Sequence, residues 1–195
     1  PDLAGSLWRN LGEVPGNGID DDGNGYVDDV HGWNFVENSP RIEFPSRRFD
    51  HGTFVGSIIA ARPVGSDVDV IGLLPQAKII TAAALRHRGD RPLHFGEGDL
   101  ASVLRAIRYV VDHGAKVVNC SFGTPVSHAD LARLNQLPIW DDLEQRGVVL
   151  VCAAGNDNSN NDERPVFPAN LPRENVISAM AIDAAGRPGR APDPR

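Results

Sequence analysis

The stretch His51-Gly52-Thr53-Phe54-Val55-Gly56 sets the interpretation of this 195-residue chain. Val55 within it and Ile58 and Ile59 after it form an apolar stripe at helical spacing, and Arg62-Pro63 ends the pattern. The sequence therefore predicts a helix that begins at His51, with the imidazole at its amino terminus.

Beyond this helix the chain alternates between short apolar runs and longer amphipathic segments. Runs of strand length occupy residues 77–85, 116–121, 148–154 and 175–182, and helical patterns occupy residues 98–113 and 128–146, the second interrupted at Pro138. Nearly continuous apolar strands separated by helices indicate a parallel sheet covered on both faces. In such sheets the working residues lie just past the carboxyl ends of the strands.

The first 50 residues differ from this pattern because they are rich in Gly, Pro, Asn and Asp. Residues 10–40 contain seven acidic side chains and no Lys or Arg, so this segment alone equals the net charge of −7 of the whole chain. The balanced charge elsewhere argues against a nucleic-acid partner, and the local excess of acid favours a cation. No run of about 20 apolar residues exists that could span a membrane.

Two further motifs follow the first in a fixed order, Asn119-Cys120-Ser121-Phe122-Gly123 and Ala153-Ala154-Gly155-Asn156. Together the three motifs resemble those of the subtilisin-like serine proteases (subtilases, peptidase S8 family). The resemblance covers roughly residues 1–183. It implies a three-layer α/β fold, with a mostly parallel sheet and helices on both faces, that is incomplete at both ends.

The resemblance also divides the chain. Residues 1–185 are expected to form a partial subtilase peptidase domain, with an acidic loop region at 1–50 and an α/β core at 51–185. Residues 186–195 carry no core-forming side chain and are predicted to be a disordered tail.

Two residues are expected to take part in catalysis. A serine protease needs an imidazole that accepts the proton of the nucleophile, and His51 suits this role. The resemblance implies that Asn156 stabilises the oxyanion. A lone histidine is more often structural, and an asparagine after glycine is more often a turn former; the ordered motifs favour the catalytic roles.

The other matched residues are implied to bind substrate. Ser121, Phe122 and Gly123 would pair with an extended polypeptide, and Ala153, Ala154 and Gly155 would form the facing wall of the primary specificity pocket. The small side chains of Ala153 and Ala154 predict room for a large apolar substrate side chain.

The chain lacks two of the family's motifs. No Asp-Ser-Gly or Asp-Thr-Gly precedes His51, and no Gly-Thr-Ser follows Asn156. We therefore expect an internal piece of a longer protein, which the resemblance implies to be a secreted or cell-surface serine endopeptidase that works through an acyl-enzyme. The piece is expected to be inactive without the flanking segments of its own domain. The alternative is a non-catalytic calcium-binding or peptide-binding module on the same fold.

The acidic loop suggests a structural calcium ion. Asp20, Asp22 and Asn24 reproduce the start of an oxygen-ligand calcium loop, Tyr26 offers its carbonyl, and Asp28 takes the ninth position. The twelfth position lacks the bidentate Glu of an EF-hand. The five aspartates of the loop repel one another unless a cation or water neutralises them, so a merely solvated loop is the alternative.

The two cysteines, Cys120 and Cys152, lie in apolar strand-like runs. This position favours two buried free thiols over a disulfide.

Overall fold

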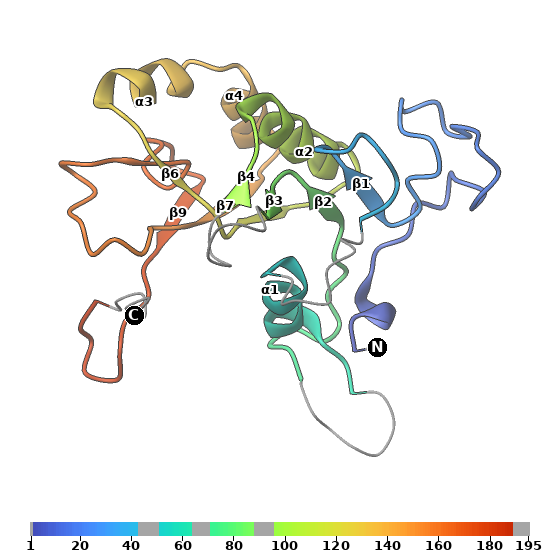
Figure 1. Ribbon diagram of the computed structural model, residues 1–195, viewed down its shortest axis with the longest axis horizontal. Helices are drawn as coiled ribbons and strands as arrows, with labels where there is room; N and C mark the ends of the chain where they lie inside the picture. The colour runs from blue at the N-terminus through green and yellow to red at the C-terminus, as the bar shows by residue number, and fades with distance from the viewer. Residues whose placement is uncertain (1, 43–50, 64–70, 88–95, 189–195) are drawn as a thin grey trace. The chain divides into compact units, whose positions relative to one another are not determined.

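The computed structural model describes residues 2–42, 51–63, 71–87 and 96–188, which form two compact units (Figure 1). Unit 1 comprises residues 1–113 and unit 2 residues 114–195. Unit 1 contains η1 (Ala4–Ser6), β1 (Gly32–Asn34), α1 (His51–Ala60), β2 (Thr81–Ala83), β3 (Arg86–His87), β4 (Gly96–Glu97) and α2 (Leu100–Asp112). Unit 2 contains β5 (Val117–Cys120), β6 (Thr124–Pro125), α3 (His128–Asn135), α4 (Ile139–Gln145), β7 (Val149–Ala153), β8 (Val166–Phe167) and β9 (Val176–Ala179).

The core of unit 1 is a parallel pair of strands beside a long amphipathic helix. Strands β1 and β2 pair in register, and α2 lies next to them (Figure 1). Asp99 caps α2, because its carboxylate accepts hydrogen bonds from the backbone and hydroxyl of Ser102. These bonds lower the pKa of Asp99.

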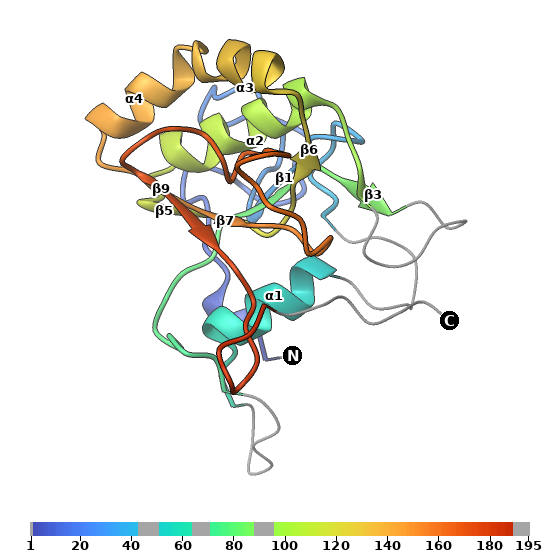
Figure 2. The same ribbon diagram turned by 90° about the vertical axis from the view of Figure 1, so that its left-hand side faces the viewer.

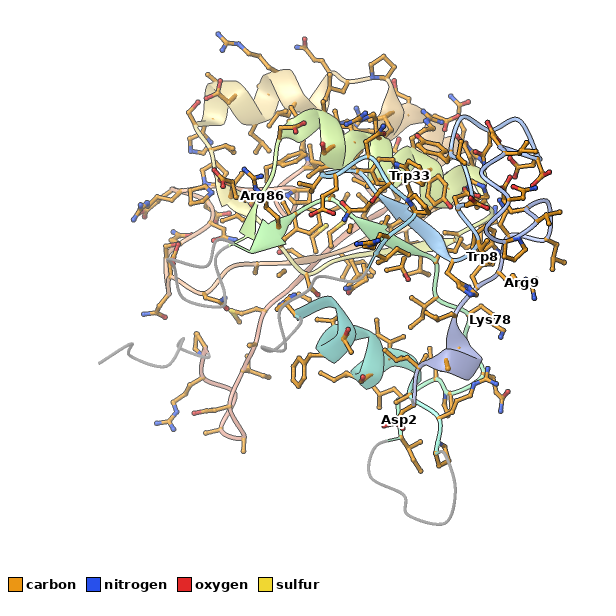
Figure 3. The ribbon with its side chains drawn as sticks, turned by 45° about the vertical axis from the view of Figure 1, so that its right-hand side comes forward. Asp2, Trp8, Arg9, Trp33, Lys78 and Arg86 are labelled. Carbon is orange, nitrogen blue, oxygen red and sulfur yellow. The ribbon has the colours of Figure 1, made fainter. Side chains whose placement is uncertain are left out.

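The amino-terminal segment is hydrogen-bonded to the residues just before β2. The Trp8 backbone N–H donates to the carbonyl of Ile79 at 2.8 Å, and the Lys78 ammonium donates to the carbonyl of Gly5 at 2.8 Å. Trp8 and Lys78 therefore lie near each other, and Trp33 projects from β1 (Figure 3).

Helix α1 begins at His51, so the predicted helix start is confirmed. Gly56 and Ala60 are its buried residues, and Leu3 and Ile79 pack against the position of Gly56. Phe54 and Ile58 are exposed. The helix therefore contacts its unit through small residues.

Unit 2 is built on three parallel strands in the order β5-β7-β9, which run side by side in Figure 2. One face of the sheet is buried through Val118, Cys120, Leu150 and Cys152. On the opposite face Val117 remains 63% exposed. The parallel strands and helices confirm the predicted α/β class.

Most of the other predicted elements are present with shorter bounds. The amphipathic segment 98–113 is α2, and the segment 128–146 is divided at Pro138 into α3 and α4. The run 77–85 is a strand only over β2. The chain turns at Asp183–Gly186, Arg187 at the start of the predicted tail pairs with Asp183, and residues 189–195 lie outside the described ranges. None of the described helices has the length and hydropathy needed to cross a membrane.

Candidate active site

The predicted catalytic and substrate-binding residues are divided between the two units. His51 is the exposed first residue of α1 in unit 1, and residues 43–50 before it lie outside the described ranges. Asn156 and both predicted binding segments belong to unit 2. The geometry of the site therefore concerns unit 2 alone, and the role of His51 stays a prediction.

The parallel register of β5 and β7 brings the two binding segments together. Cys120, the last residue of β5, pairs with Cys152 in β7. Ser121–Gly123 and Ala153–Gly155 consequently leave the same edge of the sheet. A Cβ atom added to Gly123 would lie 3.7 Å from the carbonyl oxygen of Ala153, so the segments face each other at van der Waals distance.

Ser121–Gly123 continue the chain directly after β5. Among the described residues of unit 2, no backbone hydrogen bond joins this segment to another, and β5 is an edge strand of the three-stranded sheet. The Ser121 hydroxyl accepts a hydrogen bond from the Asn119 amide at 2.9 Å. An edge strand is the usual template for the addition of an extended peptide as a further strand.

Val166 contacts both binding segments, and the sequence did not suggest it. Its Cγ1 lies 2.6 Å from the position of a Cβ atom on Gly123, and its Cγ2 lies 3.8 Å from that position on Gly155. Val166 is held in place because its backbone N–H donates to the Asn170 side chain at 3.0 Å and its carbonyl accepts from the Asn170 N–H. The Val166 side chain is buried.

Gly155 turns the chain after β7 and directs Asn156 to the surface. Its φ is +104°, a conformation that residues with a Cβ rarely adopt. The Asn161 amide donates to the carbonyl of Ala154 at 2.9 Å and holds the residue before the turn. Asn156 itself is exposed.

In unit 1 the acidic loop is organised around the buried carboxylate of Glu13. Its Oε1 accepts from the backbone N–H groups of Asp21 and Asp22, and its Oε2 accepts from that of Asp28. A buried carboxylate needs such donors. Glu13 therefore joins the two acidic runs of the loop.

Of the predicted calcium ligands, Asp20 and Asp28 mainly accept hydrogen bonds from the loop backbone. Asp28 accepts from the N–H groups of Gly16, Asn17 and Gly18, and Asp20 from those of Asn24 and Gly25. The Asn24 side chain donates to both Asp22 and Asp29.

Asp29, fully buried, connects the loop to α2. Its carboxylate accepts from the Asn10 amide at 2.7 Å, the Asn24 amide at 3.0 Å and the Tyr109 hydroxyl at 2.7 Å, and His113 Nε2 lies 3.9 Å away. Burial and this carboxylate raise the pKa of Tyr109, which therefore stays a hydrogen-bond donor.

Three carboxylates of the loop meet closely enough to hold a cation. One oxygen from each of Glu13, Asp22 and Asp29 lies within 4.8 Å of the other two. Two oxygens bound to one calcium ion at about 2.4 Å are at most about 4.8 Å apart, so this donor set fits. Only Asp22 belongs both to this cluster and to the set predicted from sequence.

Comparison with known proteins shows the family to which this chain belongs. The sequence profile of the subtilase family (peptidase S8) matches residues 1–191. The chain belongs to the subtilase family. The family resemblance inferred from the three motifs is thus confirmed.

Several curated subtilases resemble this chain over part of their length. It is 36% identical to subtilisin-like protease 1 of Plasmodium berghei over 124 residues, 63% of this chain and 19% of that protein. It is 30% identical to a thermophilic serine proteinase of Bacillus sp. (strain AK1) over 158 residues, 81% of this chain and 34% of that protein. The subtilase chain thus spans between a fifth and a third of these relatives.

A solved structure supports the fold. The prenylagaramide maturation protease PagA superimposes with a TM-score of 0.52 and 30% identity, over 75% of this chain and 48% of that one. The expected subtilisin-like α/β fold is therefore confirmed.

The contact between Val166 and the binding segments can be tested by measuring stability, which does not require enzymatic activity. Gly123→Ala in the subtilase chain places a methyl group 2.6 Å from Val166 Cγ1, so we expect the free energy of unfolding to fall by about 1–3 kcal/mol. Val166→Ala removes that atom, and the double variant should lose less stability than the sum of the two single variants. Urea denaturation measures all four proteins.

Gly5→Ala is the matched control, because its added Cβ atom meets only the flexible end of Arg62 at 3.4 Å. It should change stability by less than about 0.5 kcal/mol. Additive losses for Gly123→Ala and Val166→Ala would show that the two residues do not contact each other.

Proposed function

We propose that the protein to which this chain belongs is a subtilisin-type serine endopeptidase. The observation that carries the proposal is the in-register pairing of β5 and β7, which places Ser121–Gly123 and Ala153–Gly155 at one sheet edge in a chain of the subtilase family. The named relatives are proteases, which supports the same activity for the whole protein.

The substrate is an extended polypeptide. It adds to Ser121–Gly123 as a strand and gains backbone hydrogen bonds that do not depend on its side chains. One substrate side chain enters the space between Gly123 and Gly155, where Val166 limits the depth. We therefore propose that small or medium apolar side chains are preferred at this position, in place of the large one expected from Ala153 and Ala154.

The chemistry is acyl transfer. His51 takes the proton of a serine nucleophile that lies outside these 195 residues, and later returns it to the leaving amine. The Asn156 amide donates a hydrogen bond to the oxyanion of the tetrahedral intermediate. Water then hydrolyses the acyl-enzyme. Because the 195 residues contain no Gly-Thr-Ser, we propose that they hydrolyse no peptide by themselves.

We further propose that the acidic loop holds a structural calcium ion. Asp20, Asp22, Asn24, Tyr26 and Asp28 are the ligands expected from sequence, and Glu13 and Asp29 are added by the carboxylate cluster. Bound calcium would neutralise the loop and fix it against α2, and it would supply no reacting group. A calcium-stabilised loop suits a secreted or cell-surface enzyme, which is the location that we propose.

The proposed catalytic roles predict how far each substitution lowers kcat. A fluorophosphonate should label a longer form of the protein that includes the Gly-Thr-Ser serine, and should leave the 195-residue chain unlabelled. In the longer form, His51→Ala should lower kcat by about 10⁶-fold, as removal of the triad histidine does in subtilisin. Asn156→Ala should lower it by about 10² to 10³-fold, the cost known for the corresponding asparagine of subtilisin.

Asp157→Ala is the matched control, because Asp157 is exposed beside Asn156 and should leave kcat within about twofold. Labelling of the 195-residue chain would contradict its proposed inactivity. A longer form that binds peptides but neither reacts nor hydrolyses would instead identify a non-catalytic peptide-binding module.

The pocket assignment predicts a change of specificity. Val166→Ala deepens the space between the binding segments, so the ratio of kcat/KM for a phenylalanine peptide to that for an alanine peptide should rise about tenfold or more. Val117→Ala makes the same chemical change on the exposed face of β5 and should leave the ratio unaltered. If Val166→Ala and Val117→Ala gave the same ratio of kcat/KM values, Val166 would not line the specificity pocket.

The calcium assignment predicts binding that depends on Asp22. Isothermal titration should detect calcium in the wild type, and a concentration 100 times Kd should add about 2.7 kcal/mol to the free energy of unfolding. Asp22→Asn changes an exposed residue that belongs to both ligand sets. It should abolish the heat of calcium binding. Glu37→Gln removes one exposed charge that belongs to neither ligand set, and this variant should bind calcium normally.

Two further variants separate the ligand sets. Asp28→Asn should weaken binding if the sequence-predicted set holds the ion, and Glu13→Gln should weaken it if the carboxylate cluster does. Absence of heat in the wild type at millimolar calcium would show that the loop is only a solvated acidic surface.

A further inference from the structure

Cys120 and Cys152 form a pair of facing thiols that the proposed chemistry does not use. They are register partners on adjacent parallel strands, so their side chains point to the same face of the sheet. Both are free and 1% exposed. Neighbouring strands lie about 4.8 Å apart, within the range of Cα separations that a disulfide bridges.

The two thiols already interact and differ in acidity. The neighbouring Cys152 side chain, together with burial, raises the pKa of Cys120. The neighbouring Cys120 thiol lowers the pKa of Cys152. Because the thiolate is the reactive form, the lowered pKa favours Cys152 as the first of the two to react with an oxidant.

Each cysteine also lies directly beside a binding segment. Cys120 precedes Ser121, and Cys152 precedes Ala153. A covalent bond between the sulfurs would draw the Cβ atoms together to about 3.8 Å, so both segments would move with the strand ends that carry them.

We propose that Cys120 and Cys152 are a two-electron oxidation site, at which a peroxide joins them in an intrachain disulfide that distorts the substrate-binding edge. The Cys152 thiolate attacks a peroxide oxygen, the O–O bond breaks, and the departing hydroxide takes up a proton to become water. The Cys120 thiol then attacks the resulting sulfenic sulfur, the S–O bond breaks, and a second water leaves. Two thiols and one hydrogen peroxide thus give one disulfide and two waters.

The effect on hydrolysis rests on the proposed function, whereas disulfide formation does not. Because small displacements of positioning groups cost up to about 100-fold in rate, oxidation lowers kcat/KM by about 10- to 100-fold. A thiol reductant restores it by reducing the disulfide to two thiols.

The experiment treats the folded chain with a small excess of hydrogen peroxide, then alkylates remaining thiols under denaturing conditions. We expect a mass lower by two hydrogens and a tryptic cross-link between residues 117–133 and 147–173. In Cys120→Ala the cross-link is absent and dimedone labels Cys152, whereas in Cys152→Ala dimedone labels little. The proposed oxidation site would be refuted by two alkylatable thiols after peroxide treatment, by sulfinic acids without a cross-link, or by a cross-link only between molecules.

The regulatory part is measured on the longer, active form. Hydrolysis should fall on oxidation and recover with reductant in the wild type, and should not respond to peroxide in Cys152→Ala. A disulfide that leaves kcat/KM unchanged would refute the regulation alone. A reduced longer form without hydrolysis would refute the proposed function, and the cross-link would still decide whether the oxidation site exists.

Discussion

The parallel pairing of β5 and β7 is the constraint on which the candidate site depends. Parallel strands end at the same edge of a sheet, and the register of Cys120 with Cys152 leaves Ser121–Gly123 and Ala153–Gly155 facing each other. A shift of one residue would turn every side chain of β7 to the opposite face and would separate the two segments. The burial of Leu150 and Cys152 opposes such a shift, because it would expose both side chains.

In unit 1 the acidic loop depends on two buried carboxylates. Glu13 accepts hydrogen bonds from the backbone of both acidic runs, and Asp29 accepts from Asn10 and Asn24 within the loop and from Tyr109 on α2. Buried charges are costly unless donors satisfy them. The loop thus has one preferred arrangement around these carboxylates, and it places Asp22 where a cation would meet three negative groups.

Much of the fold follows from local patterns. The start of α1 at His51, the division of α3 from α4 at Pro138 and the parallel β5 and β7 were predicted because helical spacing, proline and apolar runs act over a few residues. The strand in 77–85 was overestimated, because an apolar run shows which residues prefer burial and not how many of them find a pairing partner. The α/β class and the subtilase family were predicted correctly.

The sequence alone determined the order of the three motifs, the identity of His51 and Asn156 as the residues to test, and the concentration of negative charge in one loop. Only the tertiary structure decided that Val166 lies against Gly123 and Gly155, that Glu13 and Asp29 join Asp22, and that the two cysteines face each other. These contacts join residues far apart in the chain, such as Asp29 and Tyr109, which are 80 positions apart. Local spacing constrains neither a strand register nor a long-range hydrogen bond, so both are determined by tertiary packing.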